Sequence, residues 1–109
     1  MRIIPDKHNA LINSLSETHS LLANRKILVC SGDRLTLTAT ILTPGINQSL
    51  VGGSTTEDEA LDIFFDRKPD LIITSEYLER GYGMRLVEKV KKHSPTTTTL
   101  IFLRRESCD

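Results

Sequence analysis

The sequence predicts an α/β protein of the doubly wound class, in which helices cover both faces of a parallel sheet. Short apolar runs such as Lys26–Ser31 (KILVCS) and Asp70–Thr74 (DLIIT) are typical of strands that are buried on both faces. Segments with helical periodicity separate these runs, and capping or turn residues bound them. Because strands alternate with helices, we expect parallel pairing through right-handed crossovers.

Composition places the chain among globular proteins with one domain. It has 109 residues, of which 39% are hydrophobic, and fourteen Lys and Arg balance fourteen Asp and Glu. The balance excludes a global attraction to nucleic acid or membrane, and no apolar stretch approaches the roughly 20 residues that span a bilayer. There is no signal-peptide pattern, and Cys30 and Cys108 lack metal or disulfide-framework spacing, so we expect a cytoplasmic protein.

The first half of the chain opens with a predicted amphipathic helix from Asp6 to about Asn24. Its apolar stripe consists of Leu11, Leu15 and Leu22. The strand over 26–31 follows, then a helix that Asp33 caps and that ends at Leu42, then a short strand over 48–53. We therefore divide the chain into an N-terminal helix within 1–25, an α/β domain over 26–105 and a tail over 106–109.

The second half repeats the alternation. Thr56-x-x-Glu59 is a capping box before a helix whose apolar face includes Phe64 and Phe65. The strand over 70–74, a glycine-punctuated loop over 76–83, a helix over 84–93 and a strand over 98–103 follow. In this class a site forms beyond the carboxyl ends of the strands, a region reached by Ser31–Asp33, Ser75-Glu76 and Arg104-Arg105.

Residues 26–105 resemble the receiver domains of bacterial response regulators. The resemblance is strongest from Val51 to Pro95, in the order EDEAL, KPDLII, a loop that ends at Gly83, and MRLVEKVKKHSP. The segment LVEKVKKHSP is most similar to receivers that precede a helix-turn-helix domain in LuxR-type regulators. The resemblance implies a flavodoxin-like receiver fold, truncated to about four strands with an extra N-terminal helix.

The same resemblance implies where phosphoryl chemistry would occur. A typical receiver has two adjacent acidic residues that hold Mg²⁺, a carboxylate that accepts the phosphoryl group, a Ser or Thr, and a Lys. Ser31 and Gly32 stand at the acidic pair, Ser75 stands at the phosphoacceptor, and Arg104 stands at the Ser/Thr position. The fifth strand and its lysine are missing. We therefore predict a vestigial pocket without metal, cofactor or catalytic residue.

An alignment shifted by one residue would offer Asp33 and Glu76 as carboxylates. Adjacent strand residues point to opposite faces, so the shift would also turn Leu71 and Ile73 out of the core. We therefore count Asp33 and Glu76 with Ser31, Gly32, Ser75 and Arg104 as parts of a pocket that has lost its chemistry.

A four-stranded sheet would leave the strand over 98–103 exposed at an edge. Two remedies are possible. The N-terminal helix could pack where the last receiver helix would lie, or two chains could pair through the unfinished edge as a homodimer. We expect the contacts to come from Leu11, Leu15, Leu22, Tyr82 and Arg105.

The leading hypothesis is a phosphorylation-independent pseudo-receiver that regulates or dimerises through protein contacts, as part of two-component signalling or transcription regulation. If the chain is a fragment, DNA would be bound only through a downstream domain, and no membrane partner is expected. The alternative is a redox or small-anion sensor that uses Cys30 and Arg104/Arg105. An enzyme is disfavoured, because no nucleophile–base pair or metal set is evident.

Overall fold

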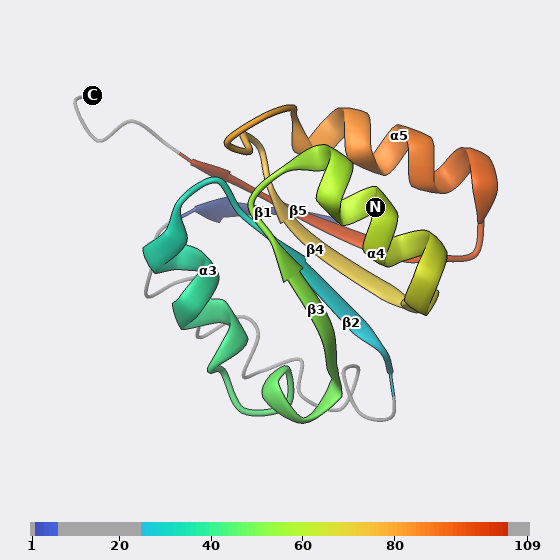
Figure 1. Ribbon diagram of the computed structural model, residues 1–109. Helices are drawn as coiled ribbons and strands as arrows, with labels where there is room; N and C mark the ends of the chain where they lie inside the picture. The colour runs from blue at the N-terminus through green and yellow to red at the C-terminus, as the bar shows by residue number, and fades with distance from the viewer. Residues whose placement is uncertain (1, 7–24, 105–109) are drawn as a thin grey trace.

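The computed structural model describes residues 2–6 and 25–104, and the predicted alternation of strands and helices is present (Figure 1). The elements in chain order are β1 (Arg2–Asp6), β2 (Ile27–Cys30), α3 (Arg34–Ile41), β3 (Leu50–Ser54), α4 (Glu57–Arg67), β4 (Leu71–Ser75), α5 (Gly83–His93) and β5 (Thr98–Arg104). A single 3₁₀ turn, Asn47–Ser49, precedes β3, so that strand begins later than predicted. None of the described helices is long and apolar enough to cross a membrane.

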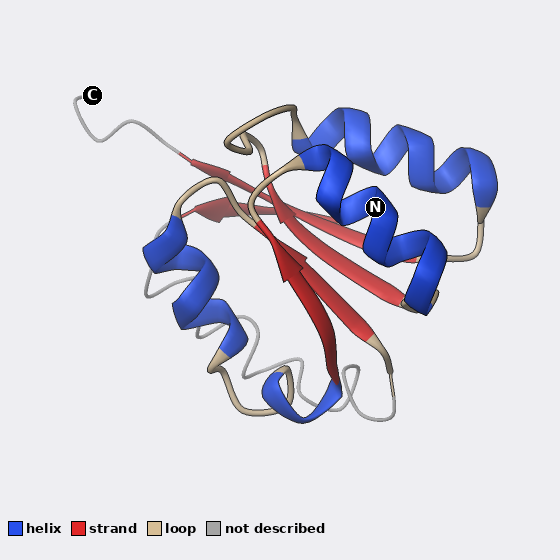
Figure 2. Cartoon of the chain, viewed as in Figure 1, coloured by secondary structure: helices blue, strands red, loops and turns tan. Residues whose placement is uncertain are grey.

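All neighbouring strands pair in parallel, in the order β1-β5-β4-β2-β3. The chain leaves β2 toward β3 and then returns past β2 to β4, so the strand order reverses between β2 and β4. Helix α3 lies on one face of the sheet and helices α4 and α5 lie on the other (Figure 2). This is the predicted doubly wound α/β class.

The sheet has a fifth strand that the sequence analysis missed. Residues Arg2–Asp6 pair with β5, with Arg2 opposite Leu100 and Asp6 opposite Arg104. The expectation that β5 forms an unfinished edge, open to a second chain, is therefore wrong. Asp6, where the predicted helix was to begin, ends β1; the rest of that helix, with Leu11, Leu15 and Leu22, lies outside the described residues.

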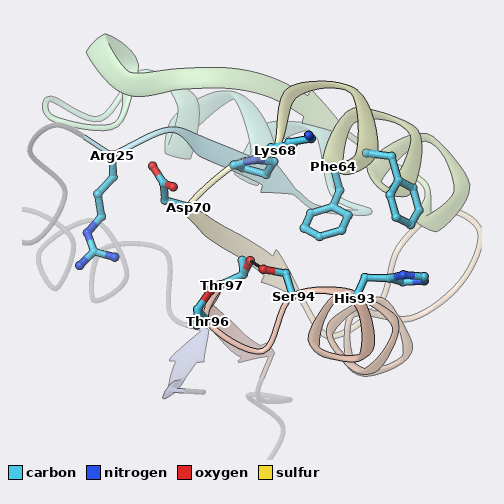
Figure 3. A pocket seen from close by; sticks show the side chains of 10 residues that line it. Arg25, Phe64, Lys68, Asp70, His93, Ser94, Thr96 and Thr97 are labelled. Atoms are coloured by element: carbon cyan, nitrogen blue, oxygen red, sulfur yellow. Dashed lines mark hydrogen bonds between the residues drawn. The ribbon is translucent and has the colours of Figure 1, made fainter.

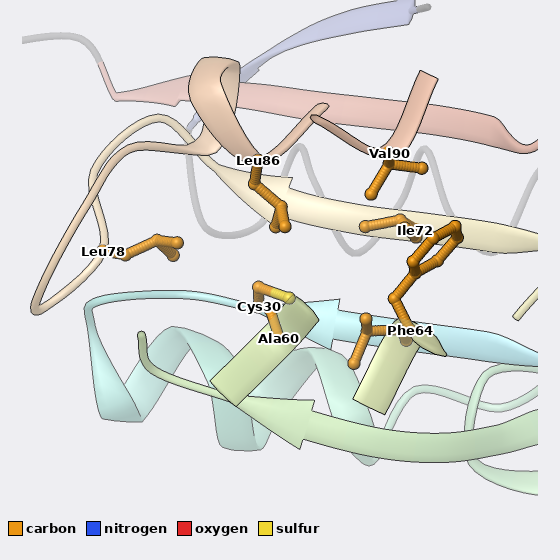
Figure 4. Close-up of a cluster of buried hydrophobic side chains, with 8 residues drawn as sticks. Cys30, Ala60, Phe64, Ile72, Leu78, Leu86 and Val90 are labelled. Carbon is orange, nitrogen blue, oxygen red and sulfur yellow. The ribbon is translucent and has the colours of Figure 1, made fainter. Parts of the chain in front are cut away.

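Each face of the sheet carries its own core, because successive side chains of a strand point to opposite faces. On the α3 face, Ile27, Val29, Ile73 and Phe102 are among the buried residues. On the α4–α5 face, Leu28, Cys30, Ile72, Leu86 and Val90 pack with Ala60, Phe64 and Leu78 (Figure 4). The strands are thus apolar on both faces, as the continuous runs predicted.

Capping residues place the helices close to where the sequence predicts them. Thr56 Oγ1 accepts the amide of Glu59 at 3.2 Å, which confirms half of the capping box. The amide of Thr56 instead donates to Ser54 Oγ at 3.1 Å. Lys68 ends α4 in the left-handed conformation with φ 50°. In α3 the threonines Thr36 and Thr40 face the sheet, and Leu35 is 79% exposed.

Candidate functional site

The carboxyl ends of β2 and β4 meet at a cavity of about 590 Å³. Ser31, Gly32 and Asp33 follow β2, Ser75 ends β4, and Glu76 begins the loop to α5. The structure brings these five residues together, with Leu35, Tyr77 and Leu78 completing the lining. The topology gives the reason, since this is where the strand order reverses.

The hydroxyl of Ser75, the residue that the sequence resemblance aligns with a phosphoacceptor, forms hydrogen bonds within the chain. Ser75 Oγ donates to the main-chain oxygen of Tyr77 at 2.7 Å and accepts the amide of Gly32 at 3.3 Å. The Gly32 amide also donates to the Tyr77 oxygen, at 3.2 Å. Ser75 is 9% exposed, and no group that could act as a base is among its hydrogen-bond partners. These bonds fasten the loop after β4 onto the end of β2.

Gly32 has no room for a side chain. A Cβ atom built on it would lie 2.8 Å from the Tyr77 oxygen and 2.9 Å from the Leu78 Cα. Both are main-chain atoms, so neither can swing away as a long side chain would. The space that a carboxylate at residue 32 would need is occupied by the β4–α5 loop.

Asp33, the carboxylate nearest the cavity on the β2 side, serves as the N-cap of α3. One carboxylate oxygen accepts a hydrogen bond from the amide of Leu35 at 3.1 Å, and the other accepts one from the Thr36 hydroxyl at 2.7 Å. Both bonds hold the carboxylate against the first turn of its own helix. Its geometry therefore fits capping better than metal binding.

The cavity does not offer the donor set of a Mg²⁺ site. Within residues 25–104, no three side chains of His, Cys, Asp or Glu come together as metal ligands would. The fold family implies Mg²⁺ held by adjacent carboxylates, whereas serine and glycine stand there in this chain. The residues at this position do not fit the ion, so no step through it is derived.

A buried carboxylate that the sequence analysis missed lies beside the site. Glu57, whose side chain is 4% exposed, forms ion pairs with Arg85 Nε at 3.0 Å and Lys89 Nζ at 2.6 Å. The amide of Tyr82 also donates to it, at 3.3 Å. Burial raises the pKa of the Glu57 carboxyl, but hydrogen bonds from Lys89 and Arg85 lower the pKa more, so it lies below its ordinary value. The cluster clamps α4 to α5 and to the loop before α5.

Large apolar side chains stand exposed around the mouth of the cavity. We call Leu35, Tyr77 and Tyr82 the apolar rim; they are 79%, 62% and 51% exposed. The rings of Tyr77 and Tyr82 meet edge-on at 5.9 Å, and the Arg85 guanidinium lies 5.6 Å from the centre of the Tyr82 ring. The sequence analysis named Tyr82 as a contact residue. It could not predict that Leu35 is exposed, because a leucine at the start of a helix is as compatible with a place in the core as with one on the surface.

Cys30, the proposed redox residue, is fully buried under α4 and α5. Burial raises the pKa of its thiol above the ordinary range, and the charge of Glu59 adds to the effect. A buried thiol of raised pKa is a poor nucleophile. The sensor hypothesis also named two arginines. Arg104 is the last residue of β5, and Arg105 lies outside the described residues.

Comparisons with known proteins find likeness in structure alone. No family model and no curated protein matches the sequence. The solved structures that resemble it include RcsB from Salmonella enterica serovar Typhimurium bound to promoter rprA in the presence of the phosphomimetic BeF3⁻, the response regulator PhyR from Brucella abortus, and the anti-anti-sigma factor PhyR from Bartonella quintana.

The likeness is close in fold and distant in sequence. The TM-scores are 0.63, 0.64 and 0.61, and the identities are 15%, 20% and 20%, in the same order. The matches cover 73%, 86% and 86% of this chain but 48%, 39% and 38% of those chains, so it spans less than half the length of each. The chain therefore has the α/β, flavodoxin-like receiver fold, and the cavity lined by Ser31, Gly32 and Ser75 lies at the switch in strand order.

Proposed function

We propose that this chain is a cytoplasmic, phosphorylation-independent pseudo-receiver, a signalling module whose output is the binding of a protein partner. The observation that carries the proposal is the contact between Gly32 and the main chain of Tyr77 and Leu78. The main-chain atoms of Tyr77 and Leu78 occupy the volume that an acidic side chain at residue 32 would need beside the acceptor position. The proposal therefore includes no catalytic role and no bound metal.

The chemistry of the acceptor position supports the same conclusion. A receiver is phosphorylated on a carboxylate, which forms a reactive acyl phosphate. Ser75 is uncharged and donates a hydrogen bond to the Tyr77 oxygen, and its hydrogen-bond partners in the described part of the chain are main-chain groups and not a side chain that could act as a base. A phosphate ester on serine would also turn over far more slowly than an acyl phosphate, which suits a reversible signal poorly.

The test is incubation with acetyl phosphate and Mg²⁺ followed by intact-mass analysis, with an active receiver treated in parallel. We expect no adduct on this chain, and a labile gain of about 80 Da on the active receiver. A labile adduct here that is lost in Glu76→Gln or Asp33→Asn, and kept in the matched surface variant Asp58→Asn, would contradict the proposal.

We propose the apolar rim as the partner-binding surface. Exposed aromatic and aliphatic side chains gathered at one edge are typical of protein contact sites, and tyrosines are frequent among the residues that dominate binding energy. Leu35 and Tyr77 line the cavity itself, next to Glu76. The rim thus combines apolar anchors with an acidic group and fits a partner segment that carries apolar and basic side chains.

Site-specific photo-crosslinking tests the surface. A photoreactive residue at position 77 should crosslink a protein in the native host, and the same residue at position 42 should not, because Leu42 is similarly exposed (65%) but lies at the other end of α3. With that protein purified, Leu35→Ala and Tyr77→Ala should each weaken binding by about tenfold, and Leu42→Ala should leave it unchanged. Equal effects of all three variants would count against the rim.

A role in transcription regulation is part of the proposal, and it rests on likeness alone. RcsB is bound to a promoter in its structure, and PhyR is described as an anti-anti-sigma factor. The described residues correspond to less than half of either protein, and DNA contact by this chain would need a further domain. A promoter-pulldown or gel-shift experiment with the present 109 residues should therefore be negative.

The alternative function, a redox sensor, finds less support. It needs an accessible thiol, and Cys30 is buried with a raised pKa. The side chains of Arg104 and Arg105, which would bind the anion, are not among the described side chains. The pseudo-receiver is therefore the function that we put forward.

A further inference from the structure

A second cavity, of about 700 Å³, lies at the opposite end of the strands from the candidate site, and Figure 3 shows its lining side chains. It opens between the carboxyl-terminal ends of α4 and α5, at the amino ends of β4 and β5. Its volume falls within the roughly 300–1,000 Å³ of small-molecule sites. The lining consists of Arg25, Phe64, Phe65, Lys68, Pro69, Asp70, His93, Ser94, Thr96 and Thr97.

One wall of the cavity is a row of rings. Phe64 points into the space between Asp70 and His93 (Figure 3). The ring of Phe65 meets Phe64 edge-on at 5.1 Å and meets the His93 imidazole edge-on at 4.9 Å. Phe65 is 51% exposed, which the sequence did not predict, since it was assigned to the buried face of its helix. An exposed phenylalanine in a cavity offers a planar, apolar surface to a ligand ring.

The charged side chains that line the cavity are mostly positive. Arg25 and Lys68 contribute two cations, against the single carboxylate of Asp70. Asp70 already accepts the amide of Lys26 at 3.1 Å. Hydroxyls complete the polar part: Thr97 donates to Ser94 at 2.7 Å, and Thr96 is exposed.

The C-termini of α4 and α5 face the cavity, and nearby ammonium groups offset part of the negative potential of their dipoles. A helix C-terminus carries partial negative charge on carbonyls that have no partner. Here Lys26 Nζ donates to the Arg67 oxygen at 3.3 Å at the end of α4, and Lys91 Nζ donates to the oxygens of Pro95 and Thr97 just after α5. These two ammonium groups bring further positive charge to the same end of the molecule.

We propose that this cavity binds a small organic carboxylate with an aromatic body. The ring of the ligand lies against Phe64 and Phe65, and its carboxylate faces the cationic side chains, chiefly Arg25 and Lys68. The inference does not depend on the loss of phosphoryl chemistry at Ser75. A ligand bound between α4 and α5 would give the module an input that needs no kinase.

A titration followed by amide NMR tests the site, with phenylacetate as the probe. Phenylacetamide and phenethylamine serve as matched compounds in which the carboxylate is replaced by a neutral or a positive group. Phenylacetate should shift the amide signals of residues 65, 68, 93 and 96 saturably, at millimolar concentration or below. It should bind at least about tenfold more tightly than either matched compound, the effect expected of one hydrogen bond to a charged group.

Variants separate this cavity from general charge attraction. Phe65→Ala, and the double change Arg25→Gln with Lys68→Asn, should each weaken phenylacetate binding about tenfold or more, since asparagine tolerates the left-handed backbone at residue 68. Lys92→Gln, an exposed charge of α5 that does not line the cavity, is the matched control and should leave binding unchanged. Amide dispersion shows whether each variant is folded, and Phe65→Ala carries the test if the double variant is not.

Several results would overturn the proposal. They are equal or tighter binding of phenethylamine, shifts that map to Ser75 rather than to His93, no saturable shift with any probe, and binding that survives Phe65→Ala. None of these results bears on the mass-based test at Ser75, so the two proposals fail independently.

Discussion

The main chains of Gly32 and Tyr77 are in direct contact. The Gly32 amide donates to the Tyr77 oxygen at 3.2 Å, and a Cβ on residue 32 would lie 2.8 Å from the same oxygen. Glycine is thus required here for close approach of two backbones and not for an unusual backbone angle. This contact closes the position at which an active receiver needs an acidic side chain.

The first prediction is that a side chain at residue 32 destabilises the fold. Gly32→Ala should lower the free energy of unfolding by about 1–3 kcal/mol, because the methyl group overlaps main-chain atoms that cannot rotate away. Gly32→Asp, which restores an acidic residue, should lower it further and should not restore phosphorylation. Urea denaturation measures the first effect, and intact mass after acetyl phosphate treatment measures the second.

Gly53→Ala is the matched control for these variants. A Cβ on Gly53 would lie 3.0 Å from the terminal Cδ1 methyl of Ile41, which can move, so the change should have little effect. If Gly32→Ala were as stable as Gly53→Ala, the loop over Gly32 would be free to open, and the contact would no longer exclude a working site.

The second prediction concerns the ion cluster of Glu57. Glu57→Gln keeps the shape of the side chain but leaves Arg85 and Lys89 without a carboxylate. We expect a loss of about 2 kcal/mol in unfolding free energy, below the roughly 3–5 kcal/mol of fully buried pairs, because both partners are about half exposed. Chemical denaturation measures it. Asp58→Asn, an exposed neighbour in the same turn, is the control and should cost well under half as much.

The third prediction is the pH dependence of that difference. The pKa of Glu57 is lower in the folded chain than in the unfolded chain, so the folded state binds fewer protons near that pKa. The contribution of Glu57 is therefore complete at neutral pH and decreases as the pH falls below the ordinary value of about 4.3. The stability gap between wild type and Glu57→Gln should narrow from pH 6 to about pH 3. A gap that widens toward acid would contradict the lowered pKa.

Local patterns predicted most of the fold because they depend on neighbours in sequence. The runs at Ile27–Cys30 and Leu71–Ser75 are apolar on both faces, and the caps Asp33 and Thr56 act on amides two or three residues away. The positions of Ser31, Gly32 and Ser75 at one edge followed from the parallel topology. These features could be read without any long-range contact.

The features that were missed depend on partners far along the chain. The segment Arg2–Asp6 is short, and Pro5 and Asp6 look like a helix start, so only its pairing with β5 reveals a strand. Glu57 reads as a first-turn acid that favours the helix N-terminus. Its burial against Arg85 and Lys89 depends on the packing of α4 on α5, which the sequence does not specify.

The last prediction concerns Cys30, which decides between the two functions drawn from the sequence. Cys108→Ser leaves Cys30 as the single thiol of the chain. Because Cys30 is fully buried and burial raises the pKa of its thiol, little reactive thiolate should form in the folded state. Iodoacetamide at neutral pH should modify it slowly in buffer and rapidly in denaturant, as mass spectrometry can follow. Rapid modification of the folded protein would mean that Cys30 is reached from solvent without unfolding, and it would return the redox sensor to consideration.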